Sequence, residues 1–308
     1  MREGDWLIGL GCASACHPAL MAPATARVHL TSNGEARVET AAHDVGTGAY
    51  TVIAQIAARK LGLALSQVSV LLGDSNLPPS PVSGGSITTA SVCNAVAMAC
   101  DKICGRLAPL SASETLSESF ARLGTGAIVE YAEFVPRGSA PEALQKLYSG
   151  RSEMVGGTMD AENVMISFGA EFVEVRVHAR TKEIRVPRIT GAFAAGHIVN
   201  PRTARGQFMG GMIWGISSAL HEATEIDPRE GRYLNDNLAD YLVPVNADIK
   251  SVEVILVPET DTLINPLGIK GLGEVANVGT SAAIANAVYH ATGTRIRKLP
   301  IRIEKLLA

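Results

Sequence analysis

The chain contains 308 residues, of which 47% are hydrophobic and 19% charged, and its formal net charge is −3. This length can bury a large core, in one large domain or in two of moderate size. The near-neutral charge and the dispersed Lys and Arg residues disfavour a partner such as DNA, RNA or an acidic lipid surface.

The sequence shows no sign of a signal peptide or a membrane anchor. Residues 1–9 include acids and glycine where a signal peptide needs an uninterrupted apolar segment, and no apolar run reaches about 18 residues. We therefore expect no membrane contact and a cytoplasmic protein, or a periplasmic one if a partner subunit exports it. The five cysteines lie in apolar segments, which favours buried free thiols over a metal site.

The first part of the chain predicts a regular series of elements. Residues 6–16 are small and apolar, typical of a buried strand, and the turn Ser32-Asn33-Gly34 joins two alternating segments in a predicted β-hairpin. The predicted elements are strands at 26–31 and 35–39, a helix from the glycine turn 44–48 to about Leu61, a buried strand at 67–73, and a helix after 83–86 that carries Val92 to Leu107.

The same series recurs after residues 110–165, which carry weaker signals and which we interpret as a connecting layer. A second hairpin is predicted around Thr181-Lys182, followed by a glycine-bearing helix at 201–220, a strand at 252–257, a glycine loop and a last helix. The sequence therefore predicts an α+β fold of two similar packed units, residues 1–160 and 161–308, each with a β-hairpin, glycine-rich helix entrances and an additional strand.

The last glycine loop, Gly268 to Gly279, is the most informative stretch of the sequence. It contains four glycines and a single carboxylate, Glu274, and leads directly into the apolar, Ala-rich segment 280–290. Such a loop exposes backbone N–H groups at a helix N-terminus and favours a bound anion. A carboxylate there is either a solvated surface residue or a general base, and these residues alone favour the first.

The run Lys270-Gly-Leu-Gly-Glu274, followed by a helix of small residues and by Thr292 to Ile301, resembles the C-terminal signature of the xanthine oxidase and aldehyde oxidase family of molybdenum hydroxylases. The resemblance covers almost the whole chain but only the C-terminal half of the family's molybdopterin-binding subunit. It implies that Glu274 is the base that removes a proton from the hydroxyl on molybdenum. Residues 235–244 are similar to the aromatic aldehyde oxidase branch of the family. Thr47 stands where the family commonly has a glutamine, and threonine also occurs there in the branch that resembles bacterial periplasmic aldehyde oxidases.

The resemblance also implies which loops contact the pterin cofactor. By themselves the glycine motifs can equally be turns, the glycines of helix 201–220 can serve close packing, and Lys270 can be a solvated cation or can lie beside Glu274 and keep it ionised. The residues that match cofactor positions are Gly46, Thr47, Gly48, Gly84, Gly85, Ser86, Gln207, Lys270, Gly271 and Gly273.

The sequence lacks the signature motifs of several other enzyme classes. The seven histidines do not form a ligand set, and His221-Glu-Ala-Thr-Glu225 departs from the zinc motif H-E-x-x-H at its last position. The sequence also contains neither a Gly-x-Ser-x-Gly elbow nor a Walker A loop, which disfavours serine hydrolases and P-loop enzymes.

The implied function is the oxidation of aldehydes to carboxylic acids with a molybdenum–molybdopterin cofactor, in the cytosine dinucleotide form usual in bacterial relatives. No protein side chain need bind the metal, because the pterin dithiolene holds it. The resemblance implies three partners: the complementary N-terminal half, a [2Fe-2S] subunit and an FAD subunit. Two alternatives stay open, a truncated non-catalytic remnant that serves assembly or binding, and a hydroxylase of N-heteroaromatic substrates.

Overall fold

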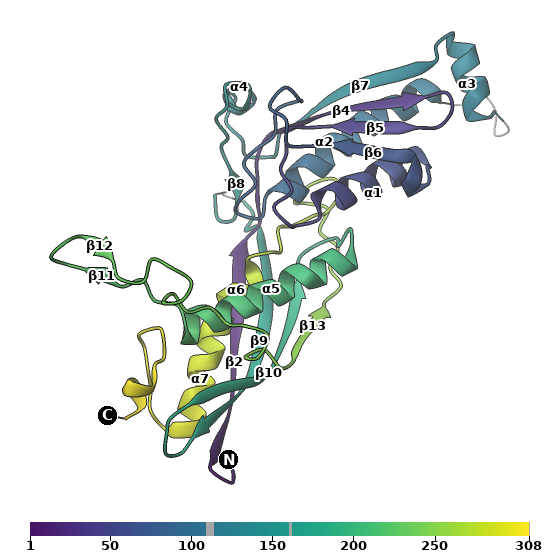
Figure 1. Ribbon diagram of the computed structural model, residues 1–308. Helices are drawn as coiled ribbons and strands as arrows, with labels where there is room; N and C mark the ends of the chain where they lie inside the picture. Colours follow the sequence, from purple (N-terminus) through teal and green to yellow (C-terminus); the bar gives the residue numbers. More distant parts are fainter. Residues whose placement is uncertain (109–113, 160–161, 308) are drawn as a thin grey trace.

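The computed structural model describes residues 1–108, 114–159 and 162–307 and shows an elongated molecule of two units, each a β-sheet with helices against one face (Figure 1). Both ends of the chain lie in the same unit, at the far end of the molecule from the other unit. Within the described residues, no helix is long and apolar enough to span a membrane.

The first unit has a four-stranded sheet in the order β6-β5-β4-β7. Helices α1 and α2 pack side by side on it, and α2 is buried along most of its length because small and apolar residues dominate it. The elements are β4 (Ala24–Thr31), β5 (Ala36–Glu39), α1 (Ala49–Leu61), β6 (Val68–Leu71), α2 (Thr88–Leu107) and β7 (Ala127–Phe134).

The second unit has a five-stranded sheet in the order β1-β2-β9-β10-β13, covered on one face by α5, α6 and α7. Its two longest strands run the length of the unit in opposite directions, β2 toward the first unit and β9 away from it (Figure 1). The elements are β1 (Arg2–Glu3), β2 (Trp6–Pro18), β9 (Ile166–His178), β10 (Ile184–Ala194), α5 (Pro201–Leu220), β13 (Val252–Leu256), α6 (Val275–Val278) and α7 (Thr280–Thr292).

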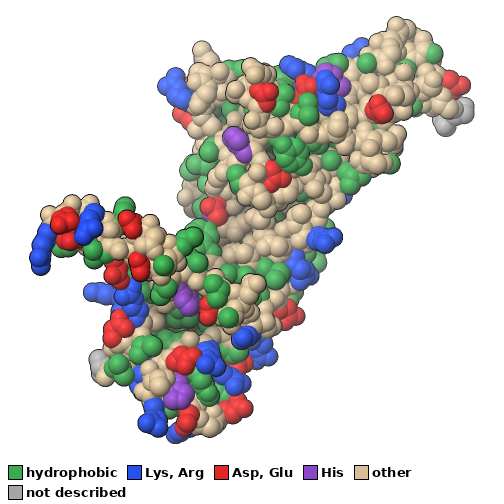
Figure 2. Space-filling view, in the orientation of Figure 1, with side chains coloured by type: hydrophobic (Ala, Val, Ile, Leu, Met, Phe, Trp, Pro, Cys, Tyr) green, Lys and Arg blue, Asp and Glu red, His purple; other side chains and the backbone are tan. Residues whose placement is uncertain are grey.

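Short elements lie outside the two sheets. The pair β11 and β12 forms the end of an arm that projects from the second unit and carries charged side chains (Figures 1 and 2). The arm also exposes Ile226, Tyr233 and Leu234. These elements are β3 (Leu20–Met21), the 3-10 helix Leu65–Gln67, α3 (Leu116–Leu123), α4 (Ala143–Tyr148), β8 (Val155–Gly156), β11 (Ile226–Asp227), β12 (Arg232–Tyr233) and the 3-10 helix Ile303–Leu306.

The predicted α+β fold is confirmed, and the two units share one topology. In both sheets a hairpin (β4–β5, β9–β10) is extended by a parallel third strand (β6, β13) and by an antiparallel fourth strand beside the first. That fourth strand is β7 in the first unit but β2, near the start of the chain, in the second. The division into residues 1–160 and 161–308 therefore stays a proposal that needs one amendment: β1 and β2 belong to the second sheet.

Several local predictions were wrong. The segment 110–165, outside its undescribed residues 110–113 and 160–161, contributes β7 to the first sheet and is more than a connecting layer. Strand β6 is an exposed edge, and β2 is buried on one face only, so neither is a fully buried strand. Among the cysteines, Cys93 and Cys100 are buried, whereas Cys12, Cys16 and Cys104 are exposed.

Glycines bring the helices of the second unit unusually close to their neighbours. A Cβ atom on Gly11 of β2 would lie 2.2 Å from the carbonyl oxygen of Ala283 on α7, and one on Gly215 of α5 would lie 2.3 Å from Thr280 Cβ. The predicted close packing of α5 glycines holds for Gly211 and Gly215. At Gly206 and Gly210 a Cβ would meet no described atom within 4 Å.

Candidate functional site

A cavity of about 370 Å³ lies where the two units meet. Four segments form its wall: the turn before α1, the loop and first residues of α2, the start and one face of α5, and the loop before α6. The lining residues are Val45, Thr47, Val52, Ser83, Gly84, Gly85, Ser86, Thr88, Thr89, His197, Ile198, Val199, Asn200, Thr203, Ala204, Gln207, Gly210, Gly211, Trp214, Ile269, Lys270, Gly271, Leu272, Gly273 and Glu274.

Glu274 is the single carboxylate among the described residues of this wall, and it directly precedes α6. Its side chain is 37% exposed. The Ser86 hydroxyl donates a hydrogen bond of 2.7 Å to Glu274 Oε2, and His17 Nε2 lies 3.4 Å from the same oxygen. Within the described chain Oε1 has no hydrogen-bond or ion-pair partner, so one oxygen is held and the other is free.

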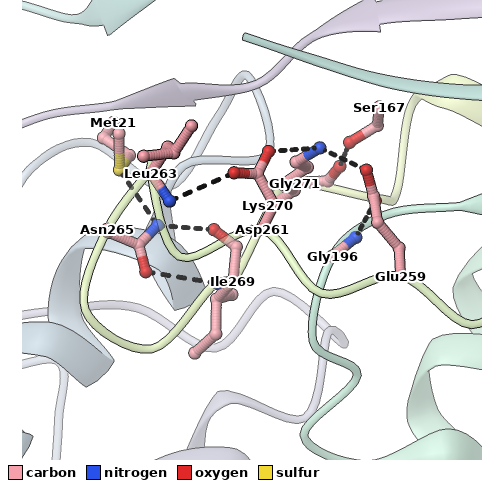
Figure 3. A network of polar contacts seen from close by, with 10 residues as sticks. All are labelled: Met21, Ser167, Gly196, Glu259, Asp261, Leu263, Asn265, Ile269, Lys270 and Gly271. Carbon is pink, nitrogen blue, oxygen red and sulfur yellow. Dashed lines mark hydrogen bonds and ion pairs between the residues drawn. The ribbon is translucent and has the colours of Figure 1, made fainter.

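The loop that carries Glu274 is fixed to both units from behind. Ser167, which lies beside His17 in the sheet, donates a 2.6 Å hydrogen bond to the carbonyl of Gly271. Asn265 donates to the Ile269 carbonyl at 2.7 Å, within the buried core of the first unit (Figure 3). Because these polar groups are buried and paired, the loop is held in one conformation.

Lys270 takes part in this support and does not ionise Glu274. Its Nζ lies 2.6 Å from Glu259 Oε1 and 2.9 Å from Asp261 Oδ2, and the side chain is 4% exposed (Figure 3). No ion pair joins Lys270 to Glu274 in the described structure. The alternative in which Lys270 keeps Glu274 ionised is therefore wrong, since the ammonium group is already shared by two other carboxylates.

The ionised state of this cluster follows from competing effects. Burial lowers the pKa of Lys270, but hydrogen bonds and charge pairing with Glu259 and Asp261 outweigh burial and raise it above its ordinary value. Burial likewise raises the pKa of Asp261, but the hydrogen bond and charge of Lys270, together with backbone hydrogen bonds from Leu263 and Ile264, outweigh burial and lower it below its usual range. Lys270 and Asp261 therefore stay charged at neutral pH and anchor the segment that leads to Glu274.

The loop before α2 faces Glu274 across the cavity. Gly85 and Ser86 have φ angles of 65° and 57°, a left-handed conformation that costs a serine roughly 1 kcal/mol. A Cβ on Gly84 would meet no described atom within 4 Å, whereas one on Gly271 would lie 2.4 Å from the Ser86 carbonyl oxygen. Gly84 thus leaves room in the cavity, and Gly271 lets the two loops touch.

The first glycine turn is arranged differently from the prediction. Asp44 Oδ1 accepts hydrogen bonds from the backbone N–H groups of Gly46 (3.0 Å) and Gly48 (3.1 Å), so these donors are already satisfied within the turn. Neither glycine lies in the cavity wall, but Thr47 between them does. We did not predict the role of Asp44, although an Asp two residues before a glycine is a known turn former.

One face of α5 completes the wall with Asn200, Thr203, Gln207, Gly210 and Trp214, which recur at helical spacing. A Cβ on Gly273 would lie 3.2 Å from Gln207 Oε1, so this amide is next to the Glu274 loop. Of these residues, the sequence predicts only Gln207 as part of the site. The periodicity of the helix could have identified the others once Gln207 was placed in the site.

Most of the predicted site residues therefore meet at one cavity, although their roles stay predictions. His17 was missed because it lies on β2, far from Glu274 in sequence, and only the pairing of β2 with β9 brings it there. The cavity offers neutral donors from Thr47 and Gln207, an acceptor oxygen from Ser86, two helix N-termini and one carboxylate. Among the described residues, no group of three or more His, Cys, Asp or Glu side chains is placed to hold a metal ion.

Known proteins resemble this chain along its length. The family model for the molybdopterin cofactor-binding domain matches residues 1–250. The aldehyde oxidoreductase molybdenum-binding subunit PaoC of Escherichia coli O157:H7 is 42% identical over 312 residues, which cover 100% of this chain and 41% of PaoC. The putative xanthine dehydrogenase molybdenum-binding subunit XdhA of Escherichia coli K12 is 30% identical over 322 residues, 99% of this chain and 42% of XdhA.

Solved structures share the fold. The aldehyde oxidoreductase of Desulfovibrio desulfuricans ATCC 27774 superposes with a TM-score of 0.81 at 23% identity, over 99% of this chain and 32% of that one. A Cu,Mo-CO dehydrogenase gives a TM-score of 0.81 at 19% identity, over 99% and 41%. The chain thus spans less than half the length of these relatives. Since the family model matches most of its residues, it belongs to the molybdenum hydroxylase family, as a molybdopterin cofactor-binding domain.

Proposed function

We propose that the chain is the C-terminal part of the molybdenum-binding subunit of an enzyme that oxidises aldehydes to carboxylic acids. The identity of 42% to the aldehyde oxidoreductase subunit PaoC, against 30% to a xanthine dehydrogenase subunit, favours an aldehyde substrate over a purine. Thr47 in the first glycine turn supports the same choice, since a hydroxyl has a shorter reach than an amide and cannot both donate and accept at an amide's spacing.

The observation that carries the proposal is the arrangement of Glu274 at the cavity. Oxidation of an aldehyde to an acid adds an oxygen from water and releases two electrons and two protons. Glu274 is the one carboxylate of the described cavity wall, and its Oε1 has no partner there, so it can accept one of these protons. Its fixed Oε2 keeps the acceptor oriented, which general base catalysis requires.

The residues of the cavity fit a pterin cofactor. Gly84 leaves open space at the wall, and Thr88 and Thr89 begin the 20-residue helix α2, whose first N–H groups have no side-chain cap and suit anionic phosphate oxygens. Thr47 and Gln207 would donate hydrogen bonds to the cofactor, and the Ser86 hydroxyl, whose hydrogen goes to Glu274, would accept one. When bound, the molybdopterin supplies the redox chemistry, and we propose its cytosine dinucleotide form.

The partners are proposed from the length of the relatives and from one exposed surface. The face of the five-stranded sheet opposite α7 carries Leu10, Phe168, Phe172 and Ile255, each at least 47% exposed. We call these four residues the outer sheet face. Large apolar side chains gathered on a sheet face are typical of an interaction surface. We propose that the complementary N-terminal half covers it, and that [2Fe-2S] and FAD subunits carry the electrons away.

The proposal is tested by expressing the chain with and without an N-terminal half taken from PaoC, and by measuring molybdenum and pterin per chain and the oxidation of an aromatic aldehyde. We expect a self-associated chain without molybdenum when it is alone, and a loaded, active complex with the N-terminal half. Xanthine and an N-heteroaromatic compound serve as comparison substrates. A complex that forms but binds neither molybdenum nor pterin would make the chain a non-catalytic remnant.

A further inference from the structure

His17 contacts the proposed base Glu274, although the proposed function assigns it no role. It lies near the end of β2, on the face that packs against the helices, and its side chain is 17% exposed. Its neighbour across the sheet is Ser167, which holds the Gly271 carbonyl at 2.6 Å. Two adjacent positions at the end of the second sheet therefore contact the Glu274 loop, one through the backbone and one through the carboxylate.

The two nitrogen atoms of His17 have different surroundings. Nε2 lies 3.4 Å from Glu274 Oε2, whereas Nδ1 is buried and has no hydrogen-bond partner in the described structure. A buried N–H without an acceptor is costly, and an unpaired acceptor nitrogen is tolerated better. This favours the tautomer with its hydrogen on Nε2, the nitrogen that faces Glu274 at 3.4 Å.

We propose that His17 is a positioning residue for Glu274, a role that rests on the proposed function. Together with Ser86 it holds the carboxylate through Oε2, so that Oε1 is left as the proton acceptor at the cavity. His17 and Ser86 come from different units of the molecule. A displacement of one unit against the other would therefore release the carboxylate from one of them.

The Lys and Arg side chains near Glu274 do not hold its carboxylate. Lys270, the basic residue of the Glu274 loop, is paired with Glu259 and Asp261, and no other Lys or Arg forms an ion pair with Glu274 in the described structure. A carboxylate that is 37% exposed and held by one hydroxyl keeps more than one side-chain rotamer accessible. We expect the contact with His17 to favour one of these rotamers.

The test uses three substitutions of His17 in the assembled enzyme. A glutamine amide reaches about as far from the backbone as Nε2, whereas an asparagine amide reaches about as far as Nδ1, and leucine has no donor. We expect His17→Leu and His17→Asn to lower kcat per bound molybdenum roughly 10-fold, with KM within about twofold of wild type, because misplaced catalytic groups slow the reaction step. His17→Gln should recover most of the loss.

A second readout does not depend on turnover. Nitrogen-15 spectra of the histidine rings report which nitrogen carries hydrogen, and the signal lost in His17→Gln identifies His17 among the seven histidines. We expect hydrogen on Nε2 in the wild type, and a changed Nε2 signal in Glu274→Gln. The exposed Glu230→Gln is the matched control and should leave this signal unchanged.

The proposal is overturned if kcat per molybdenum is the same in all three His17 variants and in the wild type, or if glutamine restores no more than asparagine. It is also overturned if Glu274→Gln leaves the ring signal of His17 unchanged. These results differ from a failure of the proposed function, in which the wild-type enzyme holds no molybdenum or Glu274→Gln turns over aldehydes normally. The ring signal tests the contact in either case.

Discussion

The loops before α2 and before α6 occupy the same place in the two units, after the third strand of each sheet, but they differ in chemistry. The first ends in Ser86 and the second in Glu274, and these two side chains are hydrogen-bonded to each other at 2.7 Å. One copy of the repeat therefore carries the proposed base, and the other carries a donor for it. The site exists only where the two copies meet.

The two loops also differ in how they are held. The loop of Glu274 is tied down by a buried lysine with two carboxylates and by Ser167 on the sheet. The loop of Ser86 has left-handed residues and open space beside Gly84. This contrast indicates a division of roles, in which the rigid loop fixes the reacting group and the open loop leaves room for a ligand.

The contact between the two loops is expected to be the most sensitive to substitution. A Cβ at Gly271 would lie 2.4 Å from the Ser86 carbonyl oxygen, a backbone atom that cannot move aside alone. We expect Gly271→Ala to separate the loops and to destabilise the protein by about 4 kcal/mol, from overpacking and the lost Ser86–Glu274 hydrogen bond together. Unfolding of the assembled enzyme measures this. Gly84→Ala is the control, and an equal loss there would contradict the account.

The second unit contains a buried carboxyl group, Glu171, that is expected to titrate near neutral pH. Glu171 is fully buried beside Thr280 at the start of α7, and burial raises its pKa from 4.5 to about 7, while hydrogen bonds from Thr280 and Gly279 lower it less. The protonated side chain is thus favoured in the folded state. Its contribution to stability is fully present below pH 4.5 and is lost as pH rises through about 7.

The stability advantage of Glu171→Gln over the wild type should therefore increase as pH rises from 5 to 8. At 1.36 kcal/mol per unit, the difference between 4.5 and about 7 sets an upper limit of about 3 kcal/mol, and relaxation around the ionised side chain reduces it to about 2 kcal/mol. Melting temperatures of both proteins at the two pH values test this. A gain that is the same at pH 5 and pH 8 would show that Glu171 does not titrate in this range.

Substitutions of two glycines in the first unit should change stability least and should differ in their effect on cofactor binding. Gly84→Val places a side chain in the cavity wall, where we expect it to lower molybdenum content severalfold and stability by less than about 1 kcal/mol. Gly46→Val lies outside the wall at a φ of 94° and should cost about 1–2 kcal/mol with molybdenum content unchanged. The opposite pattern in metal analysis would refute the division of roles.

The repeat and most of the cavity could be predicted because their signals are local. Alternation, helical spacing and glycine runs showed the hairpins, the helices and the loops that contain Gly84 and Glu274. Long-range pairing could not be predicted in the same way. The place of β2 beside β9, the contact of His17 with Glu274, and the pairing of Lys270 with Glu259 all depend on which segments meet after folding.

The central claim, that Glu274 accepts a proton at this cavity, is tested most directly by Glu274→Gln in the assembled enzyme. The amide keeps the shape of the side chain and loses the base, so we predict nearly unchanged molybdenum content and a rate of aldehyde oxidation lower by roughly 10² to 10⁴. Glu274→Asp, which retains a displaced carboxylate, should fall between the two. A glutamine variant that keeps more than half of the wild-type rate per molybdenum would contradict the account.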